Sequence, residues 1–214
     1  MKNNKIVTFG EIMLRLATPG YSRFVQTQSF NSTYGGGEAN VAVALSNYGM
    51  KSYFVTKLPK HEIGQSAINS LRNYGVNTDL VVRGGDRVGI YFLETGASQR
   101  ASKVIYDRAY SAISQAKSEE FDWENIFDGK DWFHWTGITP ALGVDAQKAV
   151  KDASIIAKKK GLKISCDLNF RQKMWTEKEA QAVMNPLMEY VDVCIANEED
   201  AEKSLGLKPA KTNI

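Results

Sequence analysis

Strand-like and helix-like segments alternate along most of this chain, and no other feature of the sequence constrains the fold as strongly. The chain opens with an apolar run typical of a strand, and similar runs recur at 52–58, 131–137, 162–168 and 191–196. Segments with the periodicity of amphipathic helices lie between them. Because strands connected through helices pair in parallel, we expect an α/β fold with helices on both faces of one sheet.

The alternation stops between residues 79 and 110. Three strand-like runs follow one another there, at 78–82, 89–95 and 103–110, and the linkers between them are too short to hold a helix. Such runs predict antiparallel hairpins. Together with a strand-like run at 24–30, they are expected to form a small sheet that joins the main domain at two separated points, about 12–34 and 79–110. We expect this sheet to act as a lid.

Charge and hydrophobicity exclude several classes of protein. The net charge of +3 is too small and too evenly spread for a protein that binds nucleic acid or a membrane surface. No stretch approaches the roughly 18 apolar residues of a membrane-spanning helix, and the first residues lack the apolar core of a signal peptide. We therefore expect a cytoplasmic protein. Cys166 and Cys194 lie within apolar strand-like runs and are expected to be buried free thiols.

The segment YGGGEAN, residues 34–40, is the most informative local motif. A nucleotide-binding P-loop needs a lysine and a hydroxyl residue after its last glycine, and here an acid, an alanine and Asn40 follow. A dinucleotide-binding GxGxxG motif is also a weak match, because no further glycine occurs before position 49. The glycines allow close approach of the backbone to a ligand, and Asn40 can both donate to and accept from hydroxyl groups. This combination suits a sugar.

From these residues the chain resembles the PfkB (ribokinase-like) carbohydrate kinases. GGGEANVAVALSNYG resembles the first signature of that family, and other segments follow in the family's order: FGEIMLRL, VGIYFLETG, YDRAYSAIS, GITPAL, DLNFR and NEEDAEKSLG. Within the family, the combination is most similar to 2-keto-3-deoxygluconate kinases. The resemblance covers nearly the whole chain and implies a three-layer αβα sandwich with a mostly parallel sheet and a small β-sheet lid. It also implies transfer of the ATP γ-phosphate to a sugar or sugar acid, with Mg²⁺.

The same resemblance implies a substrate site beneath the lid, formed by Gly35, Gly36, Asn40, Tyr91, Tyr106, Arg108, Ile138 and Arg171. Arg108 and Arg171 would face the carboxylate of a keto acid, because a guanidinium can bind a carboxylate through two parallel hydrogen bonds. A neutral sugar would not need two arginines. The alternative for Arg108 is a solvated residue on an exposed strand, and the alternative for Tyr91 is simple packing in a half-buried sheet.

A second group of polar residues is implied to meet ATP and magnesium. Asp167 and Asn169 alternate just past the C-terminal end of a strand, where open α/β sheets bind ligands, although such residues also build turns. Asn197 begins a family motif that helps to hold hydrated Mg²⁺ beside the ATP phosphates. Asp200 replaces the family's glutamate there, so we expect its contact with the metal to pass through water. An asparagine followed by acids is also typical of a helix N-terminus.

The family's catalytic segment, GAGD, does not occur in this sequence. In the family it supplies the general base and a helix N-terminus for phosphate oxygens. The segment RGGDR at 83–87 is no substitute, because it joins two strands of the expected lid. We therefore expect residues 1–214 to be the N-terminal two thirds of one ribokinase-like domain, with the C-terminal part missing and the general base beyond residue 214. Such a chain is expected to be inactive alone.

Other functions stay open from the sequence. A fructokinase or ribokinase-type kinase would act on a neutral sugar, and a native length of 214 residues would favour a non-catalytic sugar-binding protein. In either case the expected partner is a small-molecule sugar or sugar acid, and not nucleic acid or a membrane. Because lid strands of such kinases often pair between subunits, the resemblance also implies a homodimer through the lid.

Overall fold

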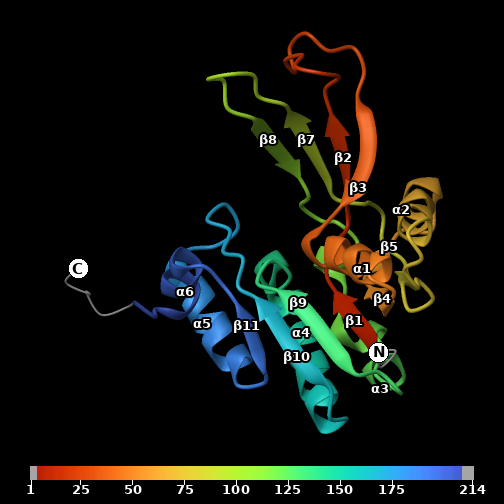
Figure 1. The fold of residues 1–214 in the computed structure, drawn as a ribbon, viewed down its shortest axis with the longest axis vertical. Helices are drawn as coiled ribbons and strands as arrows, with labels where there is room; N and C mark the ends of the chain where they lie inside the picture. Colours follow the sequence, from red (N-terminus) through yellow and green to blue (C-terminus); the bar gives the residue numbers. More distant parts are fainter. Residues whose placement is uncertain (1–3, 209–214) are drawn as a thin grey trace.

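A five-stranded parallel sheet forms the centre of the molecule, as seen in a computed structural model that describes residues 4–208 (Figure 1). Its strands, in spatial order, are β11 (Val193–Ile195), β10 (Lys163–Asp167), β9 (Trp132–Thr136), β1 (Lys5–Phe9) and β4 (Lys51–Val55). Every neighbouring pair in this sheet is parallel. The prediction of a mostly parallel sheet is confirmed.

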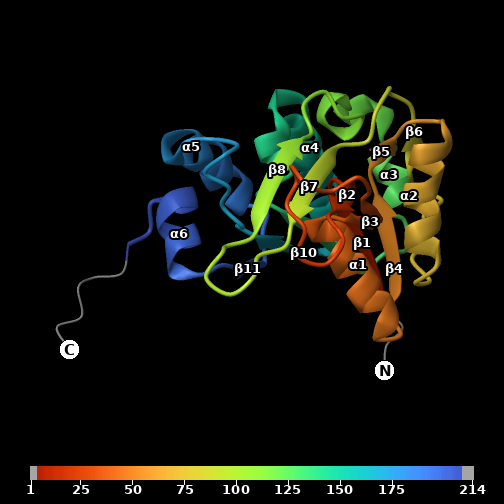
Figure 2. The same ribbon diagram turned by 90° about the horizontal axis from the view of Figure 1, so that it is seen from above.

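Helices cover both faces of this sheet, as Figure 2 shows from above. α1 (Gly37–Asn47) packs against β1 and β4 on one face, and α4 (Val144–Lys159) packs against β9 and β10 on the other. The strand residues alternate accordingly. Phe54 belongs to a buried cluster with residues of α1, whereas Val55 belongs to one with residues of α4. The predicted three-layer arrangement is therefore confirmed.

The other helices lie around these layers. They are α2 (Glu62–Arg72), α3 (Trp123–Ile126), α5 (Glu177–Met188) and α6 (Glu198–Leu205), with the 3-10 turns η1 (Ile113–Gln115), η2 (Ser118–Glu120) and η3 (Pro140–Leu142). α3 packs against α4, and α5 packs against α6. Within residues 4–208, no helix is long and apolar enough to cross a membrane.

A second sheet stands above the main body (Figure 1) and is called the lid below. Its strands, in spatial order, are β3 (Asn31–Gly35), β2 (Met13–Ala17), β7 (Ile90–Glu94) and β8 (Lys103–Asp107). β2 and β7 come from separate parts of the chain and pair in parallel, while β3 and β8 pair with them in antiparallel fashion. The lid is therefore a mixed sheet that connects to the main body through two chain segments.

Two expected lid strands are wrong. The run at 78–82 does not enter the lid. Its end belongs to β6 (Val82–Arg83), which pairs in parallel with β5 (Lys57–Leu58). The segment stays on the main body because the backbone N–H of Val82 donates to the carbonyl oxygen of Thr56. The run at 24–30 forms turns, because its backbone amides bond locally to Arg23, and the strand begins only at Asn31. The expectation of purely antiparallel pairing also fails at β2 and β7.

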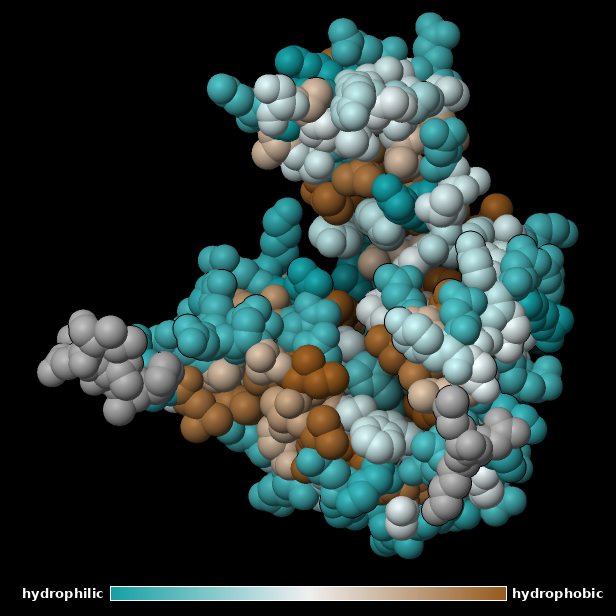
Figure 3. Space-filling model, in the orientation of Figure 1, coloured by the Kyte–Doolittle hydropathy of each residue, from teal (hydrophilic) through white to brown (hydrophobic). Residues whose placement is uncertain are grey.

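The two cysteines differ in exposure. Both thiols are free, as expected, and Cys166 is buried in the core. Cys194 is exposed, which corrects the expectation that both are buried. The reason is its place on β11, one of the two edge strands of the main sheet among the described residues. Val193 and Ile195 on this strand are also exposed, and apolar side chains reach the surface there (Figure 3).

Candidate functional site

The glycine segment lies where the lid meets the main body. Gly36 has an extended backbone, with φ of −175°, so it is not required for its conformation. It is required for space, because a Cβ at this position would lie 1.9 Å from the carbonyl oxygen of Glu11. A Cβ on Gly35 would lie 3.5 Å from the hydroxyl of Tyr91 and 3.7 Å from Oδ1 of Asn40. The structure thus brings the two glycines, Asn40 and Tyr91 together.

One row of side chains crosses the inner face of the lid. The strand registers place Thr33 beside Arg15, Arg15 beside Tyr91, and Tyr91 beside Tyr106. The rings of Tyr91 and Tyr106 have centroids 6.0 Å apart. Partial burial raises the pKa of Tyr91, and the nearby charge of Arg15 opposes this shift. Both predicted tyrosines therefore share one face with an arginine that the sequence reading did not select.

Arg108 is not a solvated lid residue. Its Nη2 donates to Oε2 of Glu11, and the other oxygen of this buried carboxylate accepts a 2.7 Å hydrogen bond from the hydroxyl of Ser111. The guanidinium also lies 5.8 Å from the ring centroid of Tyr106. Glu11 was missed by the sequence reading. Its position just after the first strand, where open sheets bind ligands, is the signal that could have found it.

The loop after β10 carries two exposed cations, Arg171 and Lys173. Nζ of Lys173 lies 6.0 Å from the ring centroid of Tyr106, so the loop reaches toward the lid. Among the described residues, neither cation has a carboxylate oxygen within 4.0 Å. The surface is hollowed between the lid and this loop (Figure 3). The cations around this hollow suit a negatively charged ligand, and Lys173 was not predicted.

Two carboxylates lie near each other at the C-terminal end of β10: Asp167 is the last residue of this strand, and Asp200 lies in the first turn of α6. The pKa of Asp167 is raised, first by burial and then by the charge of Asp200, while the backbone amide of Asn169 and the charge of Arg171 oppose the shift. Oδ1 of Asp200 accepts a 3.0 Å hydrogen bond from the backbone of Phe170. Within residues 4–208, no group of three or more His, Cys, Asp or Glu side chains forms a metal site.

Asn197 is the N-cap of α6, because its side-chain oxygen accepts a 2.7 Å hydrogen bond from the backbone of Asp200. The capping interpretation of this residue is therefore correct, and it fixes the position of Asp200 relative to the loop after β10. Asn169 lies in the same loop and has a positive φ of 39°, a conformation that asparagine tolerates better than most residues. The turn interpretation of Asn169 also agrees with the structure.

Ile138 lies beside the start of α1 and depends on a buried acid for its position. Its backbone N–H donates to the hydroxyl of Thr136, at 3.2 Å. That hydroxyl donates at 2.8 Å to Oε1 of Glu38, which also accepts from the backbone of Thr136 at 3.0 Å and from the hydroxyl of Thr139 at 2.7 Å. Glu38 is 1% exposed and therefore connects α1 to the end of β9 inside the core. The sequence reading assigned it no role.

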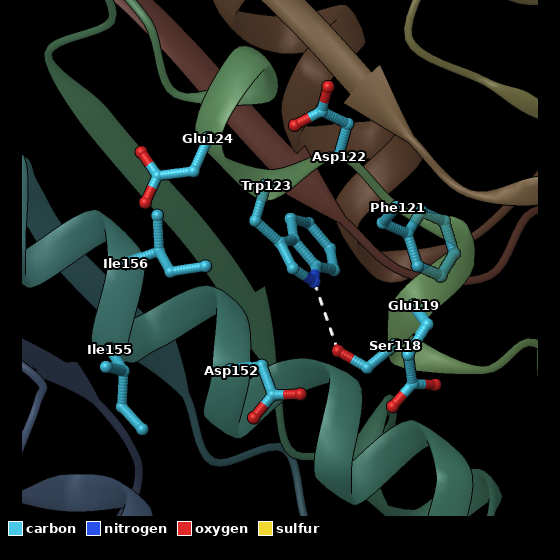
Figure 4. A pocket seen from close by; sticks show the side chains of 9 residues that line it. All are labelled: Ser118, Glu119, Phe121, Asp122, Trp123, Glu124, Asp152, Ile155 and Ile156. Atoms are coloured by element: carbon cyan, nitrogen blue, oxygen red, sulfur yellow. Dashed lines mark hydrogen bonds between the residues drawn. The ribbon is translucent and has the colours of Figure 1, made fainter.

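The described residues also form two other hollows. One of about 400 Å³ lies between η2, α3 and α4 (Figure 4), and contains none of the predicted site residues. Lys148 pairs with Glu119 and Asp152, and Lys160 pairs with Glu124. The negative charge of most acidic residues that line this hollow is therefore neutralised by lysines. A smaller hollow of about 240 Å³ lies between β3, α1 and the end of α2, and includes Gly35 and Asn40 in its lining.

Comparisons with known sequences find relatives over nearly the whole chain. A model of the pfkB family carbohydrate kinases matches residues 3–213. The chain is 34% identical over 203 residues to a 2-dehydro-3-deoxygalactonokinase of Haloferax volcanii, covering 95% of this chain and 64% of the relative. It is 31% identical over 209 residues to a 2-dehydro-3-deoxygluconokinase of Thermoproteus tenax, covering 95% of this chain and 62% of the relative.

Solved structures give the same result. The chain is similar to a 2-dehydro-3-deoxygluconokinase of Thermotoga maritima, with a TM-score of 0.94, 60% identity, and coverage of 96% of this chain and 63% of that one. A putative ribokinase II of E. coli, at 22% identity and a TM-score of 0.85, shows the fold alone, and covers 96% of this chain and 66% of that one. The ribokinase-like fold is therefore confirmed. The chain spans less than two thirds of the length of these proteins.

Proposed function

The chain belongs to the pfkB family of carbohydrate kinases, and from this premise we propose that the full-length protein transfers the γ-phosphate of ATP to a hydroxyl group of a small sugar acid. The hydroxyl oxygen forms a bond to phosphorus, the bond from phosphorus to ADP breaks, and the hydroxyl proton passes to a base. Catalysis of this kind depends mainly on positioning and on compensation of the phosphate charge. The proposed function of the full-length protein is therefore that of a sugar kinase.

The proposed substrate is 2-keto-3-deoxygluconate. One observation supports this choice: the charged groups of Arg108 and Lys173 lie near the ring of Tyr106, and Arg171 lies in the same loop as Lys173. Three cationic side chains around one hollow favour a substrate with a carboxylate over a neutral sugar. The relatives from Haloferax volcanii and Thermoproteus tenax are named for deoxy keto acids, which supports the same class.

The proposed site assigns each group a simple role. Gly35, Gly36 and Asn40 meet the hydroxyl groups of the sugar acid, and Gly36 lets this segment lie close against the backbone of Glu11 because it has no side chain. Tyr91 and Tyr106 cover the substrate from the lid. Arg108 and Arg171 face its carboxylate, and Ile138 packs against its carbon chain. These residues are contributed by the glycine segment, the lid, and the loops after β9 and β10.

ATP and Mg²⁺ are proposed to lie on the other side of the loop after β10. Asp167, Asn169 and Asn197 would lie beside the phosphates, and Asp200 would contact the hydrated metal through water. The pKa of Asp167 is raised first by burial and then by the charge of Asp200, and a cation beside the two carboxylates would relieve the second of these effects. When bound, Mg²⁺ would offset the charge of the phosphate groups.

The transfer step needs a general base that none of these residues supplies. Because the GAGD segment of the family does not occur in the 214 residues, we propose that this polypeptide by itself binds the sugar acid without phosphorylating it. Losing such a base lowers the rate by about 10²- to 10⁴-fold in typical enzymes. We also place the protein in the cytoplasm, where ATP and sugar acids are available.

The function is tested with the full-length protein expressed from its gene, ATP and Mg²⁺, by measuring ADP formation on 2-keto-3-deoxygluconate, fructose and ribose. The keto acid is expected to have a kcat/KM at least about 100-fold above those of the neutral sugars, because only the acid offers a carboxylate that can form charge-assisted hydrogen bonds with Arg108 and Arg171. Faster turnover of fructose or ribose would instead identify a fructokinase or ribokinase-type enzyme. Sugar binding without ADP formation would identify a binding protein.

A homodimer through the lid is also proposed. The outer face of the lid carries a row formed by Leu16, Phe92 and Ile105, and Phe30 packs on Phe92 with ring centroids 5.7 Å apart. Ile105 is 51% exposed and Phe30 is 40% exposed. Apolar side chains on an open sheet face are typical of an interface between subunits.

The dimer is tested by sedimentation of the full-length protein. Replacing Ile105 by Glu is expected to weaken self-association at least about 10-fold, because the charge would have to be buried against apolar groups. Tyr48→Glu, at an exposed position at the end of α1, is the matched control and is expected to leave self-association unchanged. Equal sedimentation of wild type and Ile105→Glu would exclude the lid as the interface.

A further inference from the structure

The lid contains an arginine whose role is not explained by its packing. Arg15 lies in the middle of β2, between Thr33 on one side and Tyr91 on the other, in the inner row of the lid. Its charge influences the phenol of Tyr91, so the two groups lie near each other. The hydroxyl of Tyr91 in turn faces Gly35 and Asn40 of the glycine segment. Arg15 therefore lies within the group of residues that would surround the substrate.

Arg15 has no acidic partner, unlike the other half-buried arginines of the lid region. Arg87 pairs with Asp107, Arg100 pairs with Glu94, and Arg108 pairs with Glu11. Within residues 4–208, Arg15 makes no such ion pair, and its Nε is buried without a hydrogen-bond acceptor. A buried donor without an acceptor is unfavourable, and an acidic ligand beneath the lid would supply the acceptor that Nε lacks among the described residues.

The charge of Arg108 is already compensated, which makes Arg15 more important for recognition. Glu11 is 3% exposed and holds Arg108 through one carboxylate oxygen while Ser111 occupies the other. A substrate carboxylate would therefore meet an arginine that is neutralised on one side. Arg15 presents an uncompensated guanidinium on the same face of the lid, next to a phenol that can donate a further hydrogen bond.

We propose that Arg15 is a substrate-binding residue, and that its guanidinium, together with the hydroxyl of Tyr91, receives a carboxylate oxygen of the sugar acid beneath the lid. This inference rests on the proposed function and adds a determinant of acid specificity to it. Arg15 acts in binding and not in the chemical step, because it lies on the lid, away from the loops proposed to hold ATP. Closure of the lid over an acidic substrate would bury this ion pair.

The test uses the full-length protein with 2-keto-3-deoxygluconate and fructose as substrates. Arg15→Gln is expected to raise KM for the keto acid about 10- to 100-fold, the loss typical of one charge-assisted hydrogen bond pair. Its kcat is expected to stay within about threefold of the wild-type value, and KM for ATP is expected to be unchanged. Arg15→Lys keeps the charge without the planar fork and is expected to recover part of the affinity.

Arg23→Gln is the matched control, because Arg23 is an exposed arginine in the turns near the lid tip and has no ion pair among the described residues. It is expected to leave KM for the keto acid unchanged. Thermal unfolding of each variant shows whether it is folded, and calorimetric titration of 2-keto-3-deoxygluconate in the absence of ATP measures binding directly. If Arg15→Gln does not fold, the test uses Arg15→Lys, whose affinity for the keto acid is expected to be lower than that of the wild type.

Two failures are distinguishable. A wild-type protein that phosphorylates no sugar acid would overturn the proposed function and this role for Arg15 with it. A wild-type protein that does phosphorylate the acid, combined with an unchanged KM in Arg15→Gln or with equal losses on the acid and on fructose, would overturn the role of Arg15 alone.

Discussion

Alanine at position 36 is expected to remove most of the activity of the full-length protein and to destabilise the junction between the lid and the main body. The added Cβ would lie 1.9 Å from the carbonyl oxygen of Glu11 and 3.0 Å from its carbonyl carbon. Both are backbone atoms, so no side-chain rotation can relieve the overlap. We expect kcat/KM to fall at least about 100-fold, and the free energy of unfolding to fall by about 3 kcal/mol.

The effect on activity is large because Glu11 also holds Arg108. Moving the backbone of Glu11 displaces a guanidinium proposed to bind the substrate carboxylate, and displacements of about 1 Å already lower rates strongly. The measurements are steady-state kinetics on 2-keto-3-deoxygluconate and urea unfolding of Gly36→Ala.

Gly35→Ala is the matched control for the stability part of this prediction. Its Cβ would make only ordinary contacts, at 3.5 Å from the hydroxyl of Tyr91 and 3.7 Å from Oδ1 of Asn40. We therefore expect Gly35→Ala to unfold at nearly the same urea concentration as the wild type. Equal stability of Gly36→Ala and Gly35→Ala would show that the backbone near Glu11 can move to accept a methyl group.

Most of the fold could be predicted from local patterns in the sequence. The parallel sheet followed from strand-like runs separated by helical ones, because a helix between two strands leaves parallel pairing as the simple solution. Likewise, the three-layer arrangement follows from the apolar residues on both sides of strands such as β4, where Phe54 and Val55 enter different buried clusters. Features that depend on a few neighbouring residues are visible in a sequence.

Features that depend on distant residues were missed. Glu38 bonds to groups 98 and 101 positions away in Thr136 and Thr139, and Glu11 bonds to Arg108, 97 positions away. The position of Glu11 just after the first strand indicates a ligand site but not its partner, and nothing near Glu38 distinguishes it from a surface acid, because the partners of both are set by the packing of the whole fold. The misplaced lid strand at 24–30 has a related cause: strand composition alone does not show whether a pairing partner lies alongside.

Alanine in place of Glu38 is expected to lower the free energy of unfolding by about 3–5 kcal/mol. The substitution removes the acceptor for the backbone N–H of Thr136 and for the hydroxyl groups of Thr136 and Thr139, and it leaves a cavity in a site that is 1% exposed. Urea unfolding measures the change. Glu62→Ala, at an exposed acid in the first turn of α2, is the matched control and is expected to cost less than about 1 kcal/mol. A similar cost for both would contradict a structural role for Glu38.

Glu38→Gln separates hydrogen bonding from charge. Glutamine keeps an oxygen that can accept from Thr136 and Thr139, so it is expected to be more stable than the alanine variant. It does not ionise, whereas burial raises the pKa of Glu38 above its ordinary value of 4.5, although the hydrogen bonds from Thr139 and Thr136 oppose this shift.

The raised pKa of Glu38 fixes the sign of a pH effect. The folded protein holds the Glu38 proton more tightly than the unfolded chain does, so this group contributes its full stability below pH 4.5 and loses it as the pH rises through the raised pKa. Relative to Glu38→Gln, the wild type is therefore expected to lose stability between pH 4.5 and neutral pH. Urea unfolding of both proteins across this range measures the difference, and a difference that does not change with pH would mean that Glu38 has the same pKa in the folded and unfolded chain. Glu38 bonds to the hydroxyl of Thr136, and this hydroxyl bonds to the backbone of Ile138 in the proposed substrate site. Ionisation of Glu38 is therefore also expected to affect the position of Ile138.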